Sequence, residues 1–384
     1  MDIYLDNSAT TKLDEEVLNA MMPYLKESYG NPSSAYRIGR ENKTIVEHAR
    51  KQVADVLNAN DDEIYFTSGG SEADNMAIKG VAFANQDKGK HIITSKIEHP
   101  AVLETCKELE RHGFEITYIS VNKDGTIDLE ELENSIQDDT ILISIMFANN
   151  EIGTIEPIKE IGDIAKKHNI LFHTDSVQAI GNIKIDVKEL GIDLLSLSAH
   201  KFYGPKGVGA LYVKEGVNFR KYLNGGHQER NKRAGTENVA GIVGLGKAIL
   251  LAYEDLEEKN KYLIKLRQYL INEINRTIVD SKINGSLTNR LPGNINISFK
   301  GVEADNILTE LDKRGIFIST GSACTTGSVE SSHVLKAIGL SDIEAHSTIR
   351  ISLGKYNTKE EIDYVVKELK NIIEKLRSYS VLYN

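Results

Sequence analysis

The sequence predicts an α/β protein with a mainly parallel central sheet flanked by helices and a smaller α+β C-terminal domain. Short β-branched runs alternate with amphipathic helical segments through the first two thirds of the chain, which is typical of a parallel sheet. After about Tyr253 this alternation gives way to longer, more charged helices. The length of 384 residues, at roughly 150 residues per domain, also favours two or three domains.

Seven runs rich in β-branched and aromatic residues predict the strands: 63–68, 91–95, 115–120, 141–147, 170–175, 194–199 and 208–213. Helical segments lie between most of them. Residues 157–168 are an example, because Ile158, Ile161 and Ile164 fall on one face of a helix. A single apolar face of this kind predicts packing against a sheet.

The C-terminal third begins with a long charged helix predicted over 255–278, which leads to a strand-like run at 294–299. A helix over 304–315, a stretch rich in Gly, Ser and Thr, and a final helix over 359–379 follow. We place a domain boundary near the long helix. The expected division is a large domain over 15–255 and a small domain formed by 1–14 together with 256–384.

Composition excludes several classes of protein. The 46 Lys and Arg against 56 Asp and Glu give a net charge of −10, which disfavours non-specific binding to nucleic acid or anionic lipid. The longest apolar stretch, 141–148, is far shorter than the about 20 residues that span a bilayer, and the N-terminus shows no secretory signal. Cys106 and Cys324 alone make neither a disulfide framework nor a zinc site. We therefore expect a cytoplasmic protein that binds neither membrane nor nucleic acid directly.

A glycine turn follows the first predicted strand, in the sequence FTSGGSEADN (66–75). Gly70 and Ser71 would begin a helix, whose free backbone N–H groups, with the Ser71 hydroxyl, suit an anion such as phosphate. The alternative is an ordinary strand–helix turn with Ser71 as the N-cap. A G-x4-G-K pattern at 241–247 follows no strand and ends without Ser or Thr, so we reject it as a phosphate-binding P-loop.

A carboxylate ends another predicted strand, in HTDSVQAIG (173–181). Asp175 could bond a heterocyclic nitrogen and hold it protonated, with Gln178 three residues further on. The alternative is that Asp175 caps the next helix.

A lysine stands at the end of a third strand, in SAHKFYGPKGVG (198–209). Lys201, delivered beside Ser198 and His200, would supply the partly desolvated amine that Schiff-base chemistry requires. The alternative is a solvated loop lysine.

A histidine follows the predicted strand 91–95, in IEHPAV (97–102). His99 could stack on a planar cofactor or shuttle a proton, and Pro100 would occupy the first turn of the next helix. The alternative is a surface histidine at a helix start.

The four motifs together fit pyridoxal phosphate. The phosphate needs a helix N-terminus and hydroxyls, the aldehyde needs a lysine, and the pyridine nitrogen needs an aspartate. In a parallel sheet such groups gather beyond the carboxyl ends of the strands, where ligands bind.

These motifs also resemble a known family. SAHKFYGPKGVGALYV, HTDSVQAIG, MFANNEIGTI, RAGTEN, STGSACTTGS and LDNSATT are similar to motifs of the NifS/IscS-type cysteine desulfurases. That family has the class V aminotransferase fold of pyridoxal phosphate enzymes, the PLP-dependent transferase fold type I. The resemblance runs from about Tyr4 to Gly354, nearly the whole chain.

The resemblance implies how the cofactor would be held. Lys201 would bind it covalently, Asp175 would bond the pyridine nitrogen, and Gln178 would contact the phenolic oxygen. His99 would stack over the ring and move protons near the substrate thiol. Four residues would hold the phosphate: Gly70, Ser71, Ser198 and His200. Ser71 stands where many relatives have threonine, but the hydroxyl is kept.

The resemblance also implies contacts for the substrate and a second subunit. Arg350 would bind the carboxylate of L-cysteine, assisted by Asn31, and Asn150 would face both cofactor and substrate. Thr236 would reach the phosphate of the other subunit, which implies a homodimer.

Cys324 determines the reaction that the resemblance implies. It lies in a polar stretch, 320–332, whose many Gly, Ser and Thr residues predict a mobile loop carrying a reactive thiol. Cys324 would take the sulfur of L-cysteine as a persulfide, leaving L-alanine. The long stretch resembles the long-loop group, which passes sulfur to iron–sulfur scaffolds, and tRNA thiolation is a further possible destination. Cys106, within a predicted helix, is expected to be a core residue.

Two other functions remain open from the sequence. One is a selenocysteine lyase or other pyridoxal phosphate β-lyase that works without the Cys324 thiol. The other is a sulfur carrier or scaffold-binding protein with a decayed cofactor site, against which the joint presence of Lys201, Asp175 and His99 argues. We expect no metal in the isolated chain, although Cys324 is a candidate ligand for a transient iron–sulfur cluster shared with a scaffold.

Overall fold

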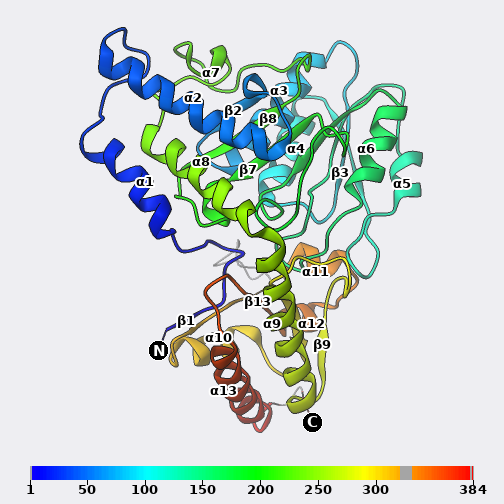
Figure 1. Cartoon of the computed structure of the whole chain (residues 1–384). Coiled ribbons are helices and arrows are strands. Elements are labelled where there is room, and N and C mark those ends of the chain that lie inside the picture. Colours follow the sequence, from blue (N-terminus) through cyan, green and yellow to red (C-terminus); the bar gives the residue numbers. More distant parts are fainter. Residues whose placement is uncertain (1, 321–330, 381–382, 384) are drawn as a thin grey trace.

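A seven-stranded sheet forms the centre of the larger part of the molecule (Figure 1). The computed structural model describes residues 2–320, 331–380 and 383. The strands are β2 (Ile64–Thr67), β3 (His91–Ser95), β4 (Glu115–Ile119), β5 (Thr140–Ser144), β6 (Leu171–Asp175), β7 (Leu194–Ser198) and β8 (Gly209–Val213). Their spatial order is β2-β8-β7-β6-β5-β3-β4. Only β8 opposes its neighbours within this sheet, so the other strands all end at one edge.

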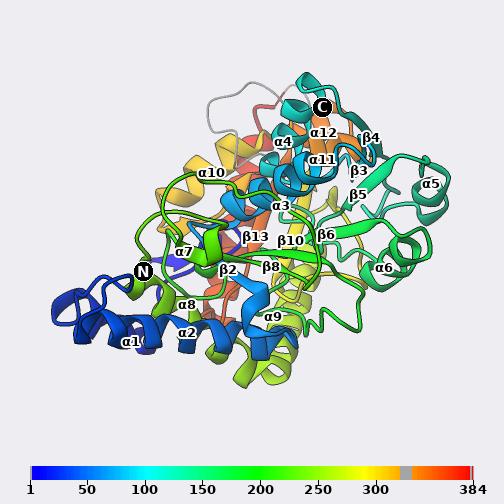
Figure 2. The ribbon, with the colours of Figure 1, turned by 90° about the horizontal axis from the view of Figure 1, so that it is seen from above.

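Helices cover both faces of this sheet, as the view from above shows (Figure 2). Neighbouring strand residues point to opposite faces, so Ile92 and Ile93 belong to different apolar clusters. The helices α1 (Glu15–Lys26), α2 (Arg37–Leu57), α6 (Ile158–Lys167) and α8 (Val239–Glu254) pack on one face. The helices α3 (Gly70–Asn85) and α4 (Pro100–Arg111) pack on the other, while the short α5 (Leu129–Asn134) lies beside α6. Burial on both faces explains why the strands are almost continuously apolar, and the predicted α/β fold is confirmed.

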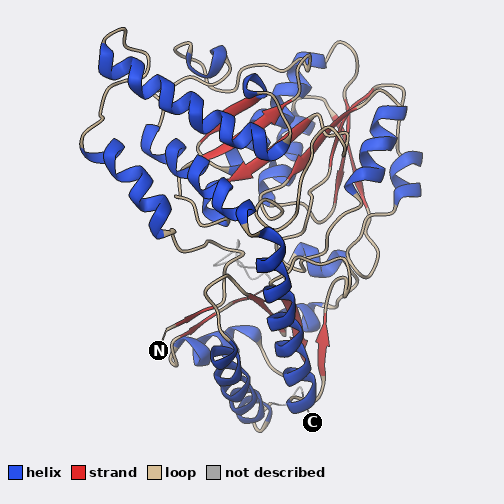
Figure 3. Cartoon of the chain, viewed as in Figure 1, coloured by secondary structure: helices blue, strands red, loops and turns tan. Residues whose placement is uncertain are grey.

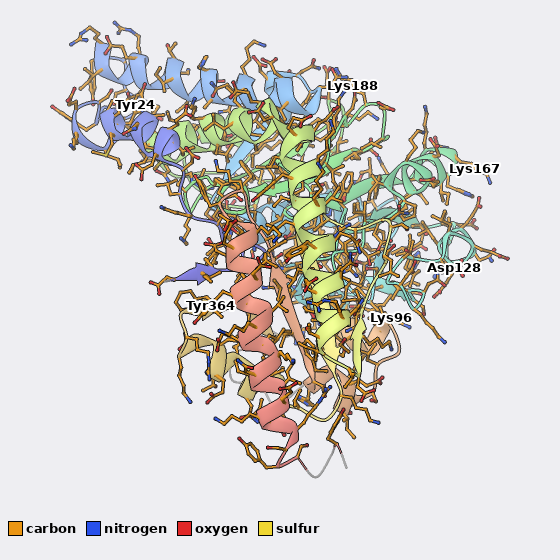
Figure 4. The ribbon with its side chains drawn as sticks, turned by 60° about the horizontal axis from the view of Figure 1, so that its bottom comes forward. Tyr24, Lys96, Asp128, Lys167, Lys188 and Tyr364 are labelled. Carbon is orange, nitrogen blue, oxygen red and sulfur yellow. The ribbon has the colours of Figure 1, made fainter. Side chains whose placement is uncertain are left out.

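The smaller part of the molecule is built on an antiparallel sheet (Figure 3). Its strands, in the order β12-β13-β10-β9, are β12 (Ser319–Thr320), β13 (Thr348–Ser352), β10 (Asn294–Phe299) and β9 (Ser281–Ile283). The helices α9 (Leu256–Thr277), α10 (Ala304–Asp312) and α13 (Lys359–Arg377) cover it and share one apolar cluster. Figure 4 shows α9 and α13 side by side, with Tyr364 on α13.

The beginning of the chain belongs structurally to this smaller part. β1 (Ile3–Tyr4) pairs in parallel with β11 (Ile316–Phe317), and the Ser8 amide donates to the Ser352 hydroxyl at 2.9 Å. Leu5 lies in the same apolar cluster as Leu263 of α9. These contacts support our proposed division into a large domain over 15–255 and a small domain of 1–14 with 256–384.

A second interface joins the two parts beside the carboxyl edge of the large sheet. The short helices α11 (His333–Ala337) and α12 (Asp342–His346) follow the undescribed residues 321–330. Val334 and Leu335 of α11 share an apolar cluster with Ile97 and Met146 of the large part. The carboxyl edge of the large sheet is therefore enclosed by residues from both ends of the chain.

Three sequence interpretations can be compared directly with the structure. The strand predicted over 141–147 ends at Ser144, although the Ile145 and Phe147 amides still donate to the carbonyls of His173 and Asp175. The G-x4-G-K pattern at 241–247 lies inside α8, which confirms that it is no P-loop. Among the described residues, no helix combines the length and apolar character needed to span a membrane.

Candidate active site

A cleft with about 830 Å³ of free space, part of it open to solvent, lies at the carboxyl edge of the large sheet. Strands β2, β6 and β7 end at it, and Arg350 reaches it from β13 of the smaller part. Ten residues that the sequence singled out line this cleft: Gly70, Ser71, His99, Asn150, Asp175, Gln178, Ser198, His200, Lys201 and Arg350. The structure therefore brings together groups that are up to 280 positions apart in the chain (70 to 350).

The glycine turn places the start of α3 at the wall of the cleft. Gly69 is the N-cap and has a φ of 153°, a conformation that side chains rarely adopt. A Cβ on Gly70 would meet Cγ2 of Val177 at 2.6 Å, so only glycine fits there. Gly69, not Ser71, is the N-cap of α3, so the alternative of a turn with Ser71 as the N-cap is wrong. The positive end of a helix of 16 residues is thus open to an anion.

Asp175 is the last residue of β6 and is only 6% exposed. Its Oδ1 accepts a hydrogen bond from the Val177 amide at 2.9 Å, and turns rather than a helix follow. Asp175 is therefore not a helix cap. Burial raises the pKa of its carboxyl, while the Val177 amide and the positive charge of Lys201 act to lower that pKa. A buried carboxylate of this kind suits a partner that carries a positive charge, such as a protonated ring nitrogen.

Lys201 closes a short 3₁₀ turn, η2 (Ala199–Lys201), directly after β7. Its Nζ donates to the backbone carbonyls of Ser8 at 2.5 Å and Ala9 at 2.8 Å. The interpretation as a solvated loop lysine is therefore wrong, because the start of the chain holds the amine inside the cleft.

Two histidines in the cleft are held as neutral rings. His99 is the N-cap of α4, and its Nδ1 accepts a hydrogen bond from the Ala101 amide at 3.1 Å. Nδ1 is then unprotonated, and desolvation lowers the pKa of His99, so its proton resides on Nε2 at neutral pH. Desolvation and the charges of Lys201 and Lys206 lower the pKa of His200 to about 4.

Arg350 lies in the middle of β13 and is 2% exposed. Its Nη2 donates to Oδ1 of Asp6 at 2.7 Å, and its Nη1 donates to the carbonyl of Asn150 at 3.2 Å. Within the described part of the chain, the Nε–H group of Arg350 has no hydrogen-bond partner. A buried guanidinium with an unused donor at a cleft suits a carboxylate ligand.

Three predicted site residues do not line the cleft in the described structure. Asn31 and Thr236 are exposed, and Asn31 Oδ1 accepts a hydrogen bond from the Ser33 amide instead. Thr236 follows Arg233, whose Nε forms an ion pair with Glu72 of α3 at 2.7 Å. Cys324 lies outside the described residues.

Cys106 is fully buried within α4. Burial raises the pKa of its thiol to about 12, so the reactive thiolate does not form at neutral pH. This confirms the expectation that Cys106 is a core residue.

Sequence reasoning missed five residues that line the cleft: Ser8, Ala9, Asp74, Met146 and Val177. Ser8 and Ala9 belong to the LDNSATT motif, which was noted for its resemblance without being given a structural role. Asp74 is one acidic residue in a helix, and no pattern in the sequence marks it as part of a site.

Comparison with known proteins agrees with this geometry. The family model described as aminotransferase class-V matches residues 3–365. A curated cysteine desulfurase IscS of Dictyoglomus turgidum is 56% identical over 379 residues, which cover 99% of this chain and 96% of that protein. A cysteine desulfurase IscS of Methanosarcina thermophila is 57% identical over 380 residues, covering 99% and 94%.

Solved structures of similar proteins show the same fold. A NifS-like protein superposes with a TM-score of 0.92 at 42% identity, over 98% of this chain and 100% of that one. A protein described as SspA in complex with cysteine gives a TM-score of 0.81 at 40% identity, over 93% and 100%. The similarity therefore spans both parts of the molecule and the cleft between them.

Proposed function

The chain belongs to the aminotransferase class-V family and is a pyridoxal-phosphate-dependent cysteine desulfurase, and we propose that it carries the sulfur of L-cysteine as a persulfide on Cys324. One observation carries the assignment of the site. The phosphate turn, Asp175, Lys201, His99 and Arg350 all line one cleft. Their agreement with what cofactor and amino-acid substrate require supports the roles proposed below.

The residues present fit pyridoxal 5'-phosphate. Gly70, Ser71, Ser198 and His200 would hold its phosphate at the open N-terminus of α3, where a side chain on Gly70 would fill the cradle. Asp175 would bond the ring nitrogen, Gln178 the phenolic oxygen, and His99 would stack on the ring. When bound, the cofactor supplies an aldehyde that binds an amine and an electron sink that stabilises negative charge at the substrate α-carbon.

The side chains of the cleft divide the remaining tasks. Arg350 would bind the carboxylate of L-cysteine with its guanidinium, in an orientation that the Asp6 ion pair and the Asn150 carbonyl fix. Lys201 would hold the cofactor, and its Nζ would accept the α-proton of the substrate. His99, whose Nδ1 is occupied by the Ala101 amide, moves a proton at Nε2 near the substrate sulfur.

The sulfur transfer is balanced without an external oxidant. The Cys324 thiolate attacks the sulfur of the substrate, an S–S bond forms, and the Cβ–S bond breaks. The electrons of that bond remain on Cβ, which gains a proton, so L-alanine leaves while Cys324 keeps a persulfide. The sulfur is oxidised by two electrons and the carbon is reduced by two.

Delivery of the sulfur involves partners beyond the single chain. We propose a homodimer, in which the exposed Thr236 reaches the phosphate of the other subunit, and we propose that the exposed Asn31 assists Arg350 in binding the substrate carboxylate. The persulfide passes to an iron–sulfur scaffold or a tRNA-thiolation protein in the cytoplasm, where Cys324 can ligate a transient cluster. The IscS names of the relatives support an iron–sulfur acceptor.

The test compares alanine and persulfide formation from L-cysteine, with a reducing acceptor, in wild type and three variants. We expect Cys324→Ser to keep bound cofactor and lose both products, and Lys201→Ala to lose the cofactor absorbance of the covalent form. Cys106→Ser is the matched control, and its sulfur transfer is expected to be unchanged. Equal alanine from wild type and Cys324→Ser would contradict the persulfide assignment and favour a β-lyase.

A further inference from the structure

Asp74 is a buried acid in the cleft that the proposed function does not use. It lies in the second turn of α3 and is 1% exposed, between the fully buried Ala73 and Met76. Its side chain lines the cleft, yet in the residues described here its Oδ1 has no hydrogen-bond partner. An ionised carboxylate is costly in such a position unless a positive charge or several donors surround it.

The nearest groups do not supply that compensation. A carboxylate oxygen of Asp74, one of Asp175 and a ring nitrogen of His99 all lie within 4.8 Å of one another. His173 Nε2 is 3.7 Å from Asp74 Oδ1, but burial lowers the pKa of His173 to about 3, so this ring is neutral. Both of its nitrogens are occupied by the hydroxyls of Ser144 and Ser196.

The contacts identify which of the two aspartates keeps the charge. Asp175 accepts the Val177 amide, and the positive charge of Lys201 favours it as a carboxylate. For Asp74, burial and the charge of Asp175 raise the pKa, and the Ser196 hydroxyl acts in the other direction. Two buried carboxyl groups this close do not both ionise, and the better solvated or better paired one holds the negative charge.

We propose that Asp74 is an un-ionised carboxylic acid in the working enzyme and acts as a positioning residue for Asp175. This inference rests on the proposed function, because it assumes that Asp175 bonds the cofactor's ring nitrogen. The un-ionised acid fills the floor of the cleft without adding a second negative charge. A second charge there would also favour protonated His99, and the proposed proton transfer at Nε2 needs a neutral ring.

The charge of Asp74 can be measured directly on the holoenzyme by infrared difference spectroscopy. A protonated carboxylic acid has a carbonyl stretch that a carboxylate lacks. We expect the wild-type enzyme to show such a band at neutral pH, and Asp74→Asn to lose it. Glu98→Gln is the matched control, since Glu98 is also a fully buried acid with a raised pKa, and it should remove a different band.

The consequence for the cofactor is tested with the same variants. Asn is neutral and nearly the same shape as the un-ionised acid, so Asp74→Asn should retain bound cofactor as the wild-type enzyme does. The pH midpoint of the bound cofactor's visible absorbance should likewise stay where it is in wild type. Asp74→Ala, which removes the group altogether, should lower cofactor retention, and rescue by Asn but not Ala is the signature of a neutral polar role.

Two results would overturn the inference. One is an infrared spectrum in which Asp74→Asn loses no carboxylic acid band, and the other is a shift of the absorbance midpoint by more than one pH unit in that variant. Should the variant not fold, the wild-type enzyme labelled with ¹³C-aspartate gives the same answer, because the band must persist above pH 7. Loss of the cofactor role of Asp175 would be seen separately, in an Asp175→Asn variant that keeps its absorbance and activity.

Discussion

Two buried arginines show how differently this chain uses the same side chain. Arg50 of α2 is 3% exposed and forms a bidentate pair with Glu229, with both N–O distances at 2.8 Å. Its Nε reaches Glu47 at 3.0 Å and its Nη1 also reaches the Ile64 carbonyl at 2.8 Å. Arg350 is as deeply buried, but it shares one carboxylate, Asp6, and leaves its Nε without a partner in the described structure.

The difference separates a structural ion pair from a binding group. Glu229 also accepts the Phe66 amide, so the Arg50 pair ties the end of β2 to the segment that precedes Thr236. Glu229 and Arg230 have left-handed φ angles of 44° and 52°. Where all donors are satisfied, the arginine stabilises the fold, whereas we propose that the incompletely bonded guanidinium of Arg350 binds a ligand.

The largest effect should follow from breaking the complete pair. Arg50→Met leaves the Glu229 carboxylate buried without its countercharge, so we expect a loss of about 3–5 kcal/mol in the free energy of unfolding. Denaturant titration measures it. Arg37→Met, at an exposed ion pair at the start of the same helix, is the control and should change stability by less than about 0.5 kcal/mol. Similar losses in both variants would mean that burial does not distinguish the two pairs.

Substitution of Arg350, whose hydrogen bonds are incomplete in the described structure, should instead lower kcat/KM for the substrate. Arg350→Lys keeps a charge for Asp6 but loses the planar fork, so we expect kcat/KM for L-cysteine to fall about 100-fold, equivalent to about 2.7 kcal/mol. Stability and bound cofactor should change little. Alanine formation and cofactor absorbance give the two readings. A variant that unfolds more easily yet keeps its kcat/KM would place Arg350 in the same class as Arg50.

Glu151, a buried acid that accepts a hydrogen bond from the Ser332 hydroxyl, offers a third case. Burial raises the pKa of Glu151 to about 7, while the Ser332 hydroxyl, at 2.5 Å, and the charge of Arg350 lower it. Glu151 therefore keeps a proton in the folded state that the unfolded chain releases above about pH 4.5, so stability falls as pH rises between about 4.5 and 7.

Between pH 5 and pH 8, we expect the free energy of unfolding to decrease by about 2 kcal/mol less in Glu151→Gln than in wild type. Unfolding curves of both proteins at several pH values measure it. Glu156, whose pKa burial raises to about 8, still contributes its own slope in both proteins, so the difference between them isolates Glu151. Parallel pH profiles for variant and wild type would show that Glu151 is ionised in the fold.

The smallest effect should come from the partly exposed pair between Arg233 and Glu72. Their side chains are 21% and 10% exposed, so solvent screens the 2.7 Å contact more than that of Arg50 and Glu229. A double-mutant cycle of Arg233→Met and Glu72→Gln should give a coupling of about 1 kcal/mol. A coupling as large as that of the Arg50–Glu229 pair would show that the contact between the Arg233 segment and α3, rather than burial, determines the strength of the Arg233–Glu72 ion pair.

The sequence predicted much of the sheet because its strands are buried on both faces. The runs 91–95 and 294–299 coincide with β3 and β10, in which every residue is buried. The helix α2 was missed, although Val46, Ala49, Val53 and Leu57 repeat at helical spacing and all face the core. A complete search for that period would have found it.

The sequence predicted those cleft residues that follow the ends of strands. Asp175, Ser198 and Lys201 follow apolar strands, and parallel strands end at a common edge, so their convergence follows from local pattern. The contacts of Lys201 with Ser8 and Ala9 and of Arg350 with Asp6 depend on pairing between the two ends of the chain. No local period encodes such pairing, so only the resemblance to a known family could bring Arg350 into the site.

The N-terminal strand has a consequence for synthesis on the ribosome. The Ser8 amide donates to the Ser352 hydroxyl, 344 positions later, and β1 can pair with β11 only after Ile316–Phe317 have been synthesised. At about 5–20 residues translated per second, this early segment stays without its partners for roughly 20–70 s. Lys201 leaves the ribosome before the N-terminal segment that holds its amine, Ser8 and Ala9, can dock against the later strands. Completion of the catalytic centre therefore comes late in translation, because Arg350 lies on β13.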